Sequence, residues 1–151
     1  MPSLKERIDV DLKEAMRSRD ELGTSVLRML KSAVKYKEVE PGGHALEDSG
    51  VLAVIQTLIK KGRDSVEQFR AGGRPELADK EEREIAKLQS YLPAQMSADE
   101  LAAAVRAAIA QVGAKGPKDM GAVMKALMPK VSGRAEGKAV SEAVKAELTP
   151  R

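Results

Sequence analysis

Apolar side chains recur at helical spacing along almost the whole chain, and very few of them are aromatic. The 151 residues include one Phe, two Tyr and no Trp, although hydrophobic residues make up 42%. Small side chains let helices approach closely, but each buries little surface. No stretch shows the β-branched alternation that is typical of a strand. The sequence therefore predicts an all-α protein of several thin helical layers.

Four helices are predicted before residue 93. Ser3 and Glu6 form a possible capping box for the first helix. Its inward stripe contains Leu4, Ile8, Leu12, Ala15 and Met16. The second helix is expected over about residues 24–38, before a proline and two glycines that stop it.

The third helix is expected to begin near residue 48, where Asp48 or Ser49 can cap it, and to end at residues 72–73. Gly62 lies on its apolar stripe. Because glycine in a helix interior costs about 1 kcal/mol relative to Ala, we expect another helix to cross closely there. The fourth helix begins at Pro75 and is broken by Pro93.

Three short helices are predicted after a boundary at about residues 93–96, which gives an N-terminal domain over 1–93 and a tail domain over 97–151. Ser97 and Glu100 are a second possible capping box. The fifth helix stops at Gly113, and the sixth opens at Pro117 and is ended or kinked by Pro129. The seventh follows Gly133 and runs to about residue 148.

The sixth and seventh predicted helices each have an apolar stripe on one side and a pair of lysines on the opposite side. In the sixth, Lys118 and Lys125 project away from the inward residues, and in the seventh Lys138 and Lys145 do the same. The inward residues expected are Met120, Val123, Met124, Leu127, Met128 and Val131 in the sixth helix and Val140, Ala143, Val144 and Leu148 in the seventh. The pattern is compatible with an ordinary solvated face and with a surface that binds phosphates.

The charge balance supports the second interpretation. Residues 1–96 carry 17 cationic and 17 acidic side chains, and residues 97–151 carry nine and six, so the whole excess of three lies in the tail. Lys130 and Arg134 add cations near the break between the last two helices, where Gly133 would let the backbone turn tightly and approach a ligand. No Asn occurs in the chain and no aromatic residue follows Tyr91, so we expect contacts to shape and backbone in preference to base readout.

Several segments resemble the GatB/YqeY family, and especially its free-standing YqeY-like members. They are LRMLKSAVKYKEVE, VLAVIQTLIKKGRDSVEQF, YLP and, most specifically, GPKDMGAVMKALMPKVSGRAEGKAV. The positions that match the family motif in the last segment are Gly121, Met124, Gly133, Ala135 and Lys138. The family commonly has Asp where this chain has Glu136, which is a poorer cap for the seventh helix.

The resemblance implies a four-helix N-terminal part and a three-helix tail. It also implies kinship with the C-terminal region of the B subunit of tRNA-dependent amidotransferase, a carbon–nitrogen ligase that uses glutamine as nitrogen donor. In that enzyme the tail helps to hold tRNA, whereas ATP and Mg²⁺ act in a separate catalytic domain. We therefore expect tRNA or another structured RNA as a partner, together with components of the amidation machinery.

Candidates for catalysis are few. The only histidine, His44, lies in a predicted loop, and the chain has no Cys and no nucleotide-binding glycine loop. We expect no catalytic residue, no metal and no cofactor. A protein–protein adaptor is the alternative function, and a ligase that acts alone is a third. The charged, periodic first segment predicts neither a leader nor a membrane anchor, so the expected location is cytoplasmic.

Overall fold

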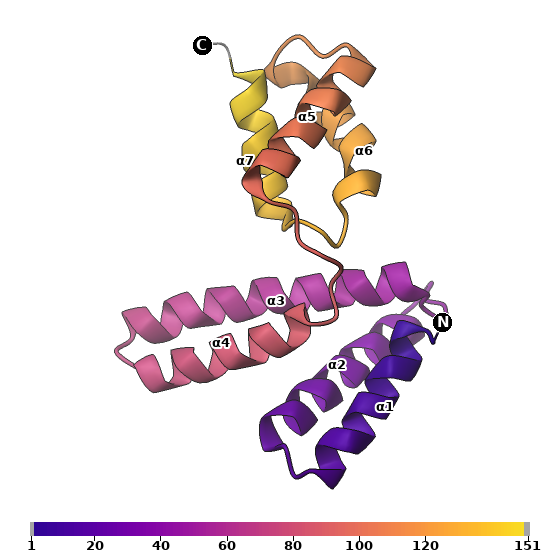
Figure 1. Ribbon diagram of the computed structural model, residues 1–151, viewed down its shortest axis with the longest axis vertical. Helices are drawn as coiled ribbons and strands as arrows, with labels where there is room; N and C mark the ends of the chain where they lie inside the picture. Colours follow the sequence, from indigo (N-terminus) through magenta and orange to yellow (C-terminus); the bar gives the residue numbers. More distant parts are fainter. Residues whose placement is uncertain (1, 150–151) are drawn as a thin grey trace. The chain divides into compact units, whose positions relative to one another are not determined.

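The computed structural model describes residues 2–149, and within them every regular element is a helix. The predicted all-α class is confirmed. The chain divides into two compact units, residues 1–92 and residues 93–151. The helices α1 (Leu4–Arg17), α2 (Glu21–Val39), α3 (Asp48–Ala71) and α4 (Pro75–Gln89) belong to the first unit. The second unit contains α5 (Ala98–Val112), the short 3₁₀ helix η1 (Pro117–Asp119), α6 (Met120–Val131) and α7 (Gly137–Leu148) (Figure 1).

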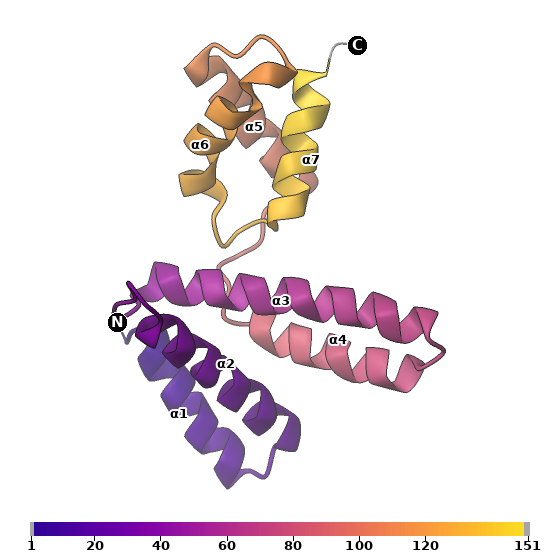
Figure 2. The same ribbon diagram turned by 180° about the vertical axis from the view of Figure 1, so that it is seen from behind.

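The first unit is two helical hairpins packed on one hydrophobic cluster. Within it α1 lies beside α2 and α3 lies beside α4, as both views show (Figures 1 and 2). The cluster includes Leu27, Leu30 and Ile55, which are completely buried. Gly62 confirms the close crossing expected from the sequence, because a Cβ placed there would lie 2.9 Å from Ile85 Cγ1 of α4.

The start of α1 is capped from two directions. Ser3 and Glu6 form the expected capping box, with the Glu6 N–H 3.2 Å from Ser3 Oγ. The Asp48 carboxylate accepts a further bond from the Leu4 N–H at 2.9 Å. The prediction that Asp48 or Ser49 caps α3 is therefore wrong: Glu47 is the N-cap of α3, without a side-chain bond, and Asp48 binds a helix 44 residues away.

Three further expectations from local patterns are wrong. Helix α2 begins at Glu21, not near residue 24, because the Asp20 side chain caps it by accepting from the Gly23 N–H at 2.9 Å. Helix α6 does not end at Pro129, as one of the two alternatives expected, but continues to Val131, whose side chain is fully buried and holds the last turn in the core. Met16 and Met128, expected to face inward, are 43% and 39% exposed.

The second unit is a three-helix bundle with its own cluster, which shares no residue with the first. All three pairs among α5, α6 and α7 are in contact. In the view of Figure 2, α6 and α7 lie in front of α5. The buried members of this cluster are Leu101, Val105, Ala108, Val123, Leu127, Val131, Val140, Val144 and Leu148. The bundle therefore exposes an outer surface between α6 and α7.

Candidate nucleic-acid interface

Two contacts with α5 show which flanks of α6 and α7 face that helix. Lys130 of α6 donates from Nζ to Gln111 Oε1 of α5 at 3.3 Å, and Glu147 of α7 pairs with Arg106 of α5 at 3.2 Å. The flanks that carry Lys130 and Glu147 therefore face α5. The opposite flanks of the same two helices face the surface between α6 and α7.

Helical spacing then places half of the ten predicted residues on that surface. Because an α-helix advances about 100° per residue, Gly121, Met124 and Met128 lie on the flank of α6 away from Lys130, and Lys125 lies nearly opposite the buried stripe. Lys138 and Lys145 lie on the flank of α7 away from Glu147. We call this set the α6–α7 face: Gly121, Met124, Lys125, Met128, Lys138 and Lys145.

The lysines of this region are open to solvent. Lys118 lies in η1, and Lys118, Lys125, Lys138 and Lys145 are all exposed. Among residues 2–149, no ion pair joins any of these four lysines to a carboxylate. Glu142 also lies on the outer side of α7, so the surface is predominantly but not uniformly cationic.

The carboxylate of Asp119, the N-cap of α6, is stabilised by neighbouring groups. The backbone N–H of Lys115 donates to its carboxylate at 2.9 Å, and this bond lowers the pKa of Asp119 below its ordinary value. The nearby charges of Lys118 and Lys115 lower this pKa further. Lys115 is exposed and was not among the predicted site residues, although its spacing from Lys118 in the segment KGPK was a signal for it.

Three predicted cations are not members of the α6–α7 face: Lys118 lies in η1, and Lys130 and Arg134 have partners elsewhere in the unit. Lys130 lies on the flank that faces α5, where it binds Gln111. Arg134 is half-buried, and its guanidinium donates from Nε to the carbonyl of Ala94 at 3.0 Å and lies 3.6 Å from a carboxylate oxygen of Glu100. Both side chains have partners within their own unit.

The motif residues of the turn between α6 and α7 shape the backbone. Gly133 has a φ of 79°, as a tight turn requires, and is buried. Its carbonyl accepts from Gln95 Nε2 at 2.9 Å. Ala135 donates its N–H to the Val131 carbonyl at 3.1 Å. At the start of α7, Glu136 is the N-cap and its side chain makes no capping bond, as the departure from the family pattern predicted.

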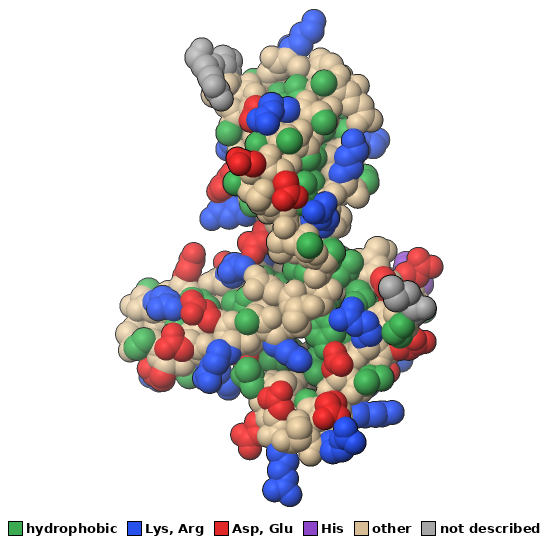
Figure 3. All heavy atoms as spheres, in the orientation of Figure 1, with side chains coloured by type: hydrophobic (Ala, Val, Ile, Leu, Met, Phe, Trp, Pro, Cys, Tyr) green, Lys and Arg blue, Asp and Glu red, His purple; other side chains and the backbone are tan. Residues whose placement is uncertain are grey.

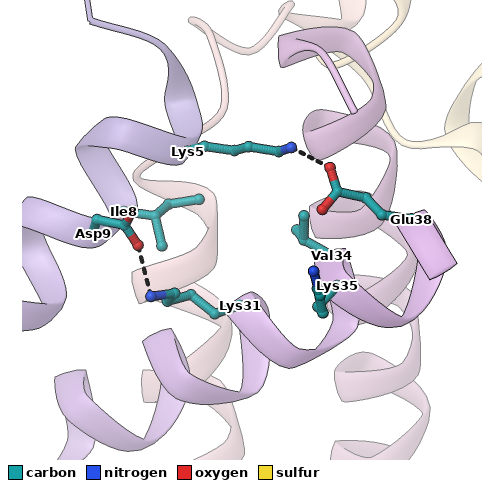
Figure 4. A pocket seen from close by; sticks show the side chains of 7 residues that line it. All are labelled: Lys5, Ile8, Asp9, Lys31, Val34, Lys35 and Glu38. Carbon is teal, nitrogen blue, oxygen red and sulfur yellow. Dashed lines mark hydrogen bonds and ion pairs between the residues drawn. The ribbon is translucent and has the colours of Figure 1, made fainter. Parts of the chain in front are cut away.

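One groove of the first unit is lined by charged side chains that pair with one another. It lies between α1 and α2, has a volume of about 170 Å³ and is drawn in Figure 4. Its lining residues are Lys5, Ile8, Asp9, Lys31, Val34, Lys35 and Glu38. Lys31 pairs with Asp9 at 2.8 Å, and Lys5 pairs with Glu38. Glu38 also accepts the Leu46 N–H at 2.7 Å, so this cluster fastens α1, α2 and the following loop together.

Chemistry-bearing groups elsewhere are isolated. His44 is exposed, and its Nδ1 lies 2.9 Å from the carbonyl of the neighbouring Ala45. Within residues 2–149, no three His, Cys, Asp or Glu side chains are grouped so that they could hold a metal ion. A search of the same residues for a helix long and apolar enough to cross a membrane found none.

Comparison with known proteins identifies the family. The family model described as "Yqey-like protein" matches residues 5–148, nearly the whole chain. This chain belongs to the YqeY-like family. The resemblance drawn from the sequence motifs is thereby confirmed.

Curated relatives cover part of the chain. A protein of Lachancea thermotolerans named "Altered inheritance of mitochondria protein 41, mitochondrial" is 35% identical over 82 residues, or 54% of this chain and 44% of the relative. The protein of the same name in Eremothecium gossypii is 33% identical over 95 residues, or 62% and 52%. An uncharacterized protein of Schizosaccharomyces pombe is 36% identical over 95 residues, or 62% and 75%. The matched region spans about half the length of the first two relatives.

The names of these relatives contradict the cytoplasmic location expected from the sequence. The first two are named as mitochondrial proteins. The expectation rested on the charged, periodic first segment and on the absence of an apolar span. A folded helical protein of this composition is compatible with either compartment, so these features do not determine location.

Proposed function

We propose that this YqeY-like protein is an RNA-binding accessory module, with tRNA as its substrate class and without catalysis of its own. The proposal includes kinship of α5–α7 with the tail of the amidotransferase B subunit, and the amidation machinery as the setting in which the RNA is used. The observation that supports it is the set of four exposed lysines, Lys118, Lys125, Lys138 and Lys145, which have no ion-pair partner among residues 2–149.

The chemistry of this surface suits a phosphate backbone. Lysine carries a compact, mobile charge on a flexible stem, which contacts phosphates well but does not read bases. The unit that contains these lysines has no aromatic side chain on which bases could stack. Recognition would therefore depend on the shape of the folded RNA and on the spacing of its phosphates.

A titration against total tRNA at several salt concentrations tests the proposal. If the four lysines each contact one phosphate of a duplex segment, a plot of the logarithm of the binding constant against the logarithm of the salt concentration should have a slope of about −3.6. Replacement of all four lysines by Ala should remove most of the binding and most of the slope. A single Lys130→Ala change should leave both nearly unchanged, because Lys130 faces α5.

The matched control is a second fourfold replacement in the first unit. Lys13, Lys60, Lys61 and Lys80 are exposed and have no ion pair among residues 2–149, so their removal changes the net charge by the same amount. This control variant should bind tRNA nearly as well as the wild type. The proposal is rejected if the wild type does not bind at low salt, or if the two fourfold variants lose the same affinity.

A protein–protein adaptor is the second candidate function, and exposed apolar residues on α2 favour it. Tyr36 is 76% exposed, Val39 is 65% exposed and Met29 is 40% exposed. Large apolar side chains at these exposures are typical of contact surfaces when they gather on one element. A partner that survives nuclease treatment and is lost on Tyr36→Ser would support the adaptor function over RNA binding.

A further inference from the structure

The segment that follows Pro93 is hydrogen-bonded to the turn between α6 and α7. The Met96 N–H donates to the Arg134 carbonyl at 2.9 Å, and Gln95 Nε2 donates to the Gly133 carbonyl at 2.9 Å. In return, Arg134 Nε donates to the Ala94 carbonyl at 3.0 Å. Residues 94–96 thus make three bonds to two adjacent turn residues, and the Met96 side chain packs against the core of the second unit.

Arg134 ties this segment to α5 as well. Its guanidinium lies 3.6 Å from a carboxylate oxygen of Glu100, in the first turn of α5. A planar guanidinium can bind two acceptors at once in a fixed geometry, which an ammonium cannot do. One side chain therefore holds the segment before α5, the first turn of α5 and the turn before α7 in one arrangement.

The chain before Pro93 is held by the first unit. Tyr91 is 4% exposed, and its hydroxyl donates to Asp11 Oδ2 at 2.5 Å. The Arg7 guanidinium lies 5.4 Å from the centre of the Tyr91 ring, within range of a cation–π interaction. Leu92 packs against the core of the same unit. The ordered contacts of the first unit therefore extend to residue 92.

We propose that Arg134 is the positioning residue that makes residues 94–96 part of the second unit, so that the link between the two units is limited to the Leu92–Pro93 junction. The proline ring fixes its own φ near −65° and restricts the residue before it. A free linker of four residues would span roughly 11 Å on average, whereas a single peptide step is about 3.8 Å. The contacts of Arg134 therefore shorten the free link between the units from about four residues to one peptide step.

Backbone ¹⁵N relaxation on the full chain tests this proposal. In the wild type, the amides of residues 94–96 should have order parameters near about 0.85, as in the helices, and in Arg134→Ala they should fall below about 0.6. Arg134→Lys should not restore the order, because the lysine keeps the charge but lacks the planar fork. Arg106→Ala is the matched control, since it removes an ion pair of the same unit that does not touch the segment.

The outcomes separate loss of the contacts from loss of the fold. The amide shifts of Val105, Val123 and Val144 report whether the bundle of the second unit is intact. If Arg134→Ala unfolds that bundle, Gln95→Ala serves instead, and it should lower the order of Gln95 and Met96. The proposal is overturned if residues 94–96 are already mobile in the wild type, or if they stay ordered in a folded Arg134→Ala or Gln95→Ala protein.

Discussion

The two units use their charged side chains differently. In the first unit, ion pairs and charged hydrogen bonds join segments that are distant in sequence: Asp9 to Lys31, Arg70 to Glu82 and Asp11 to Tyr91. On the face of this unit drawn in Figure 3, cationic and acidic side chains are interspersed. In the second unit, Arg106 and Arg134 also make contacts within the unit, whereas Lys118, Lys125, Lys138 and Lys145 have no ion pair among residues 2–149.

The comparison separates charges that hold the fold from charges available to a partner. Residues 1–96 carry equal numbers of cationic and acidic side chains, whereas residues 97–151 have three more cationic than acidic. Net charge alone would make all cations of the tail equivalent. The contacts of Lys130 and Arg134 show that they are not, because these two side chains are occupied within the unit.

The largest expected effect is the loss of stability in one unit, with the other unit nearly unchanged, after truncation of a core leucine. Leu27 and Leu127 are each completely buried, in separate clusters. Truncation of a buried Leu to Ala costs about 2–5 kcal/mol, so Leu27→Ala should melt the first unit at a lower temperature and leave the second nearly unchanged. Leu127→Ala should do the reverse. Calorimetry with amide shifts measured for each unit checks this, and equal destabilisation of both units by either variant would contradict it.

A smaller effect distinguishes two helical glycines. At Gly62, an added Cβ would lie 2.9 Å from Ile85. Overpacking costs about 1–3 kcal/mol and improved helix propensity returns about 1 kcal/mol, so Gly62→Ala should destabilise the first unit by about 1 kcal/mol. At Gly121, an added Cβ meets nothing within 4 Å. Gly121→Ala should therefore stabilise the second unit, by up to about 1 kcal/mol.

The Gly121→Ala variant also sharpens the functional comparison. Gly121 lies on the α6–α7 face, so a methyl group there would keep an RNA backbone at a distance although it stabilises the protein. Chemical denaturation and tRNA titration of the same sample measure the two effects. Increased stability with weaker binding supports RNA contact at this face, whereas increased stability with unchanged binding would place any RNA elsewhere.

Local signals predicted the elements that depend on local chemistry. The capping box of Ser3 and Glu6, the close approach at Gly62 and the buried stripes of α6 and α7 follow from side chains within one or two helical turns or from the cost of a glycine. The start of α2 was missed because Gly23 resembles a break. In the structure, the missing Cβ leaves room for the Asp20 carboxylate that caps this helix.

Long-range partners could not be read from the sequence. Asp48 looks like a cap for its own helix, but it binds Leu4, and Arg134 looks like a phosphate ligand, but it binds Ala94. In both cases the partner is 40 or more residues away, and the residue type alone fits either role. The four exposed lysines were predicted from helical spacing together with the charge excess of the tail and the family resemblance, and RNA contact at these positions stays a prediction.

The smallest expected effect concerns Glu38 in the charged groove between α1 and α2. The hydrogen bond from Lys5 and the Leu46 N–H lower the pKa of Glu38 below its ordinary value, which is about 4.3 in an unfolded chain. A lowered folded-state pKa contributes stability that is present in full above the unfolded value and is lost as pH falls through the folded value. The first unit should therefore lose stability below about pH 4.3, and Glu38→Gln should make this loss of stability smaller.

Glu14→Gln, which removes a carboxylate from an exposed pair with Arg17, is the control and should keep the wild-type profile. Unfolding by urea from pH 3 to 6 measures the slopes, and identical slopes for Glu38→Gln and the wild type would show that this cluster does not couple protonation to folding.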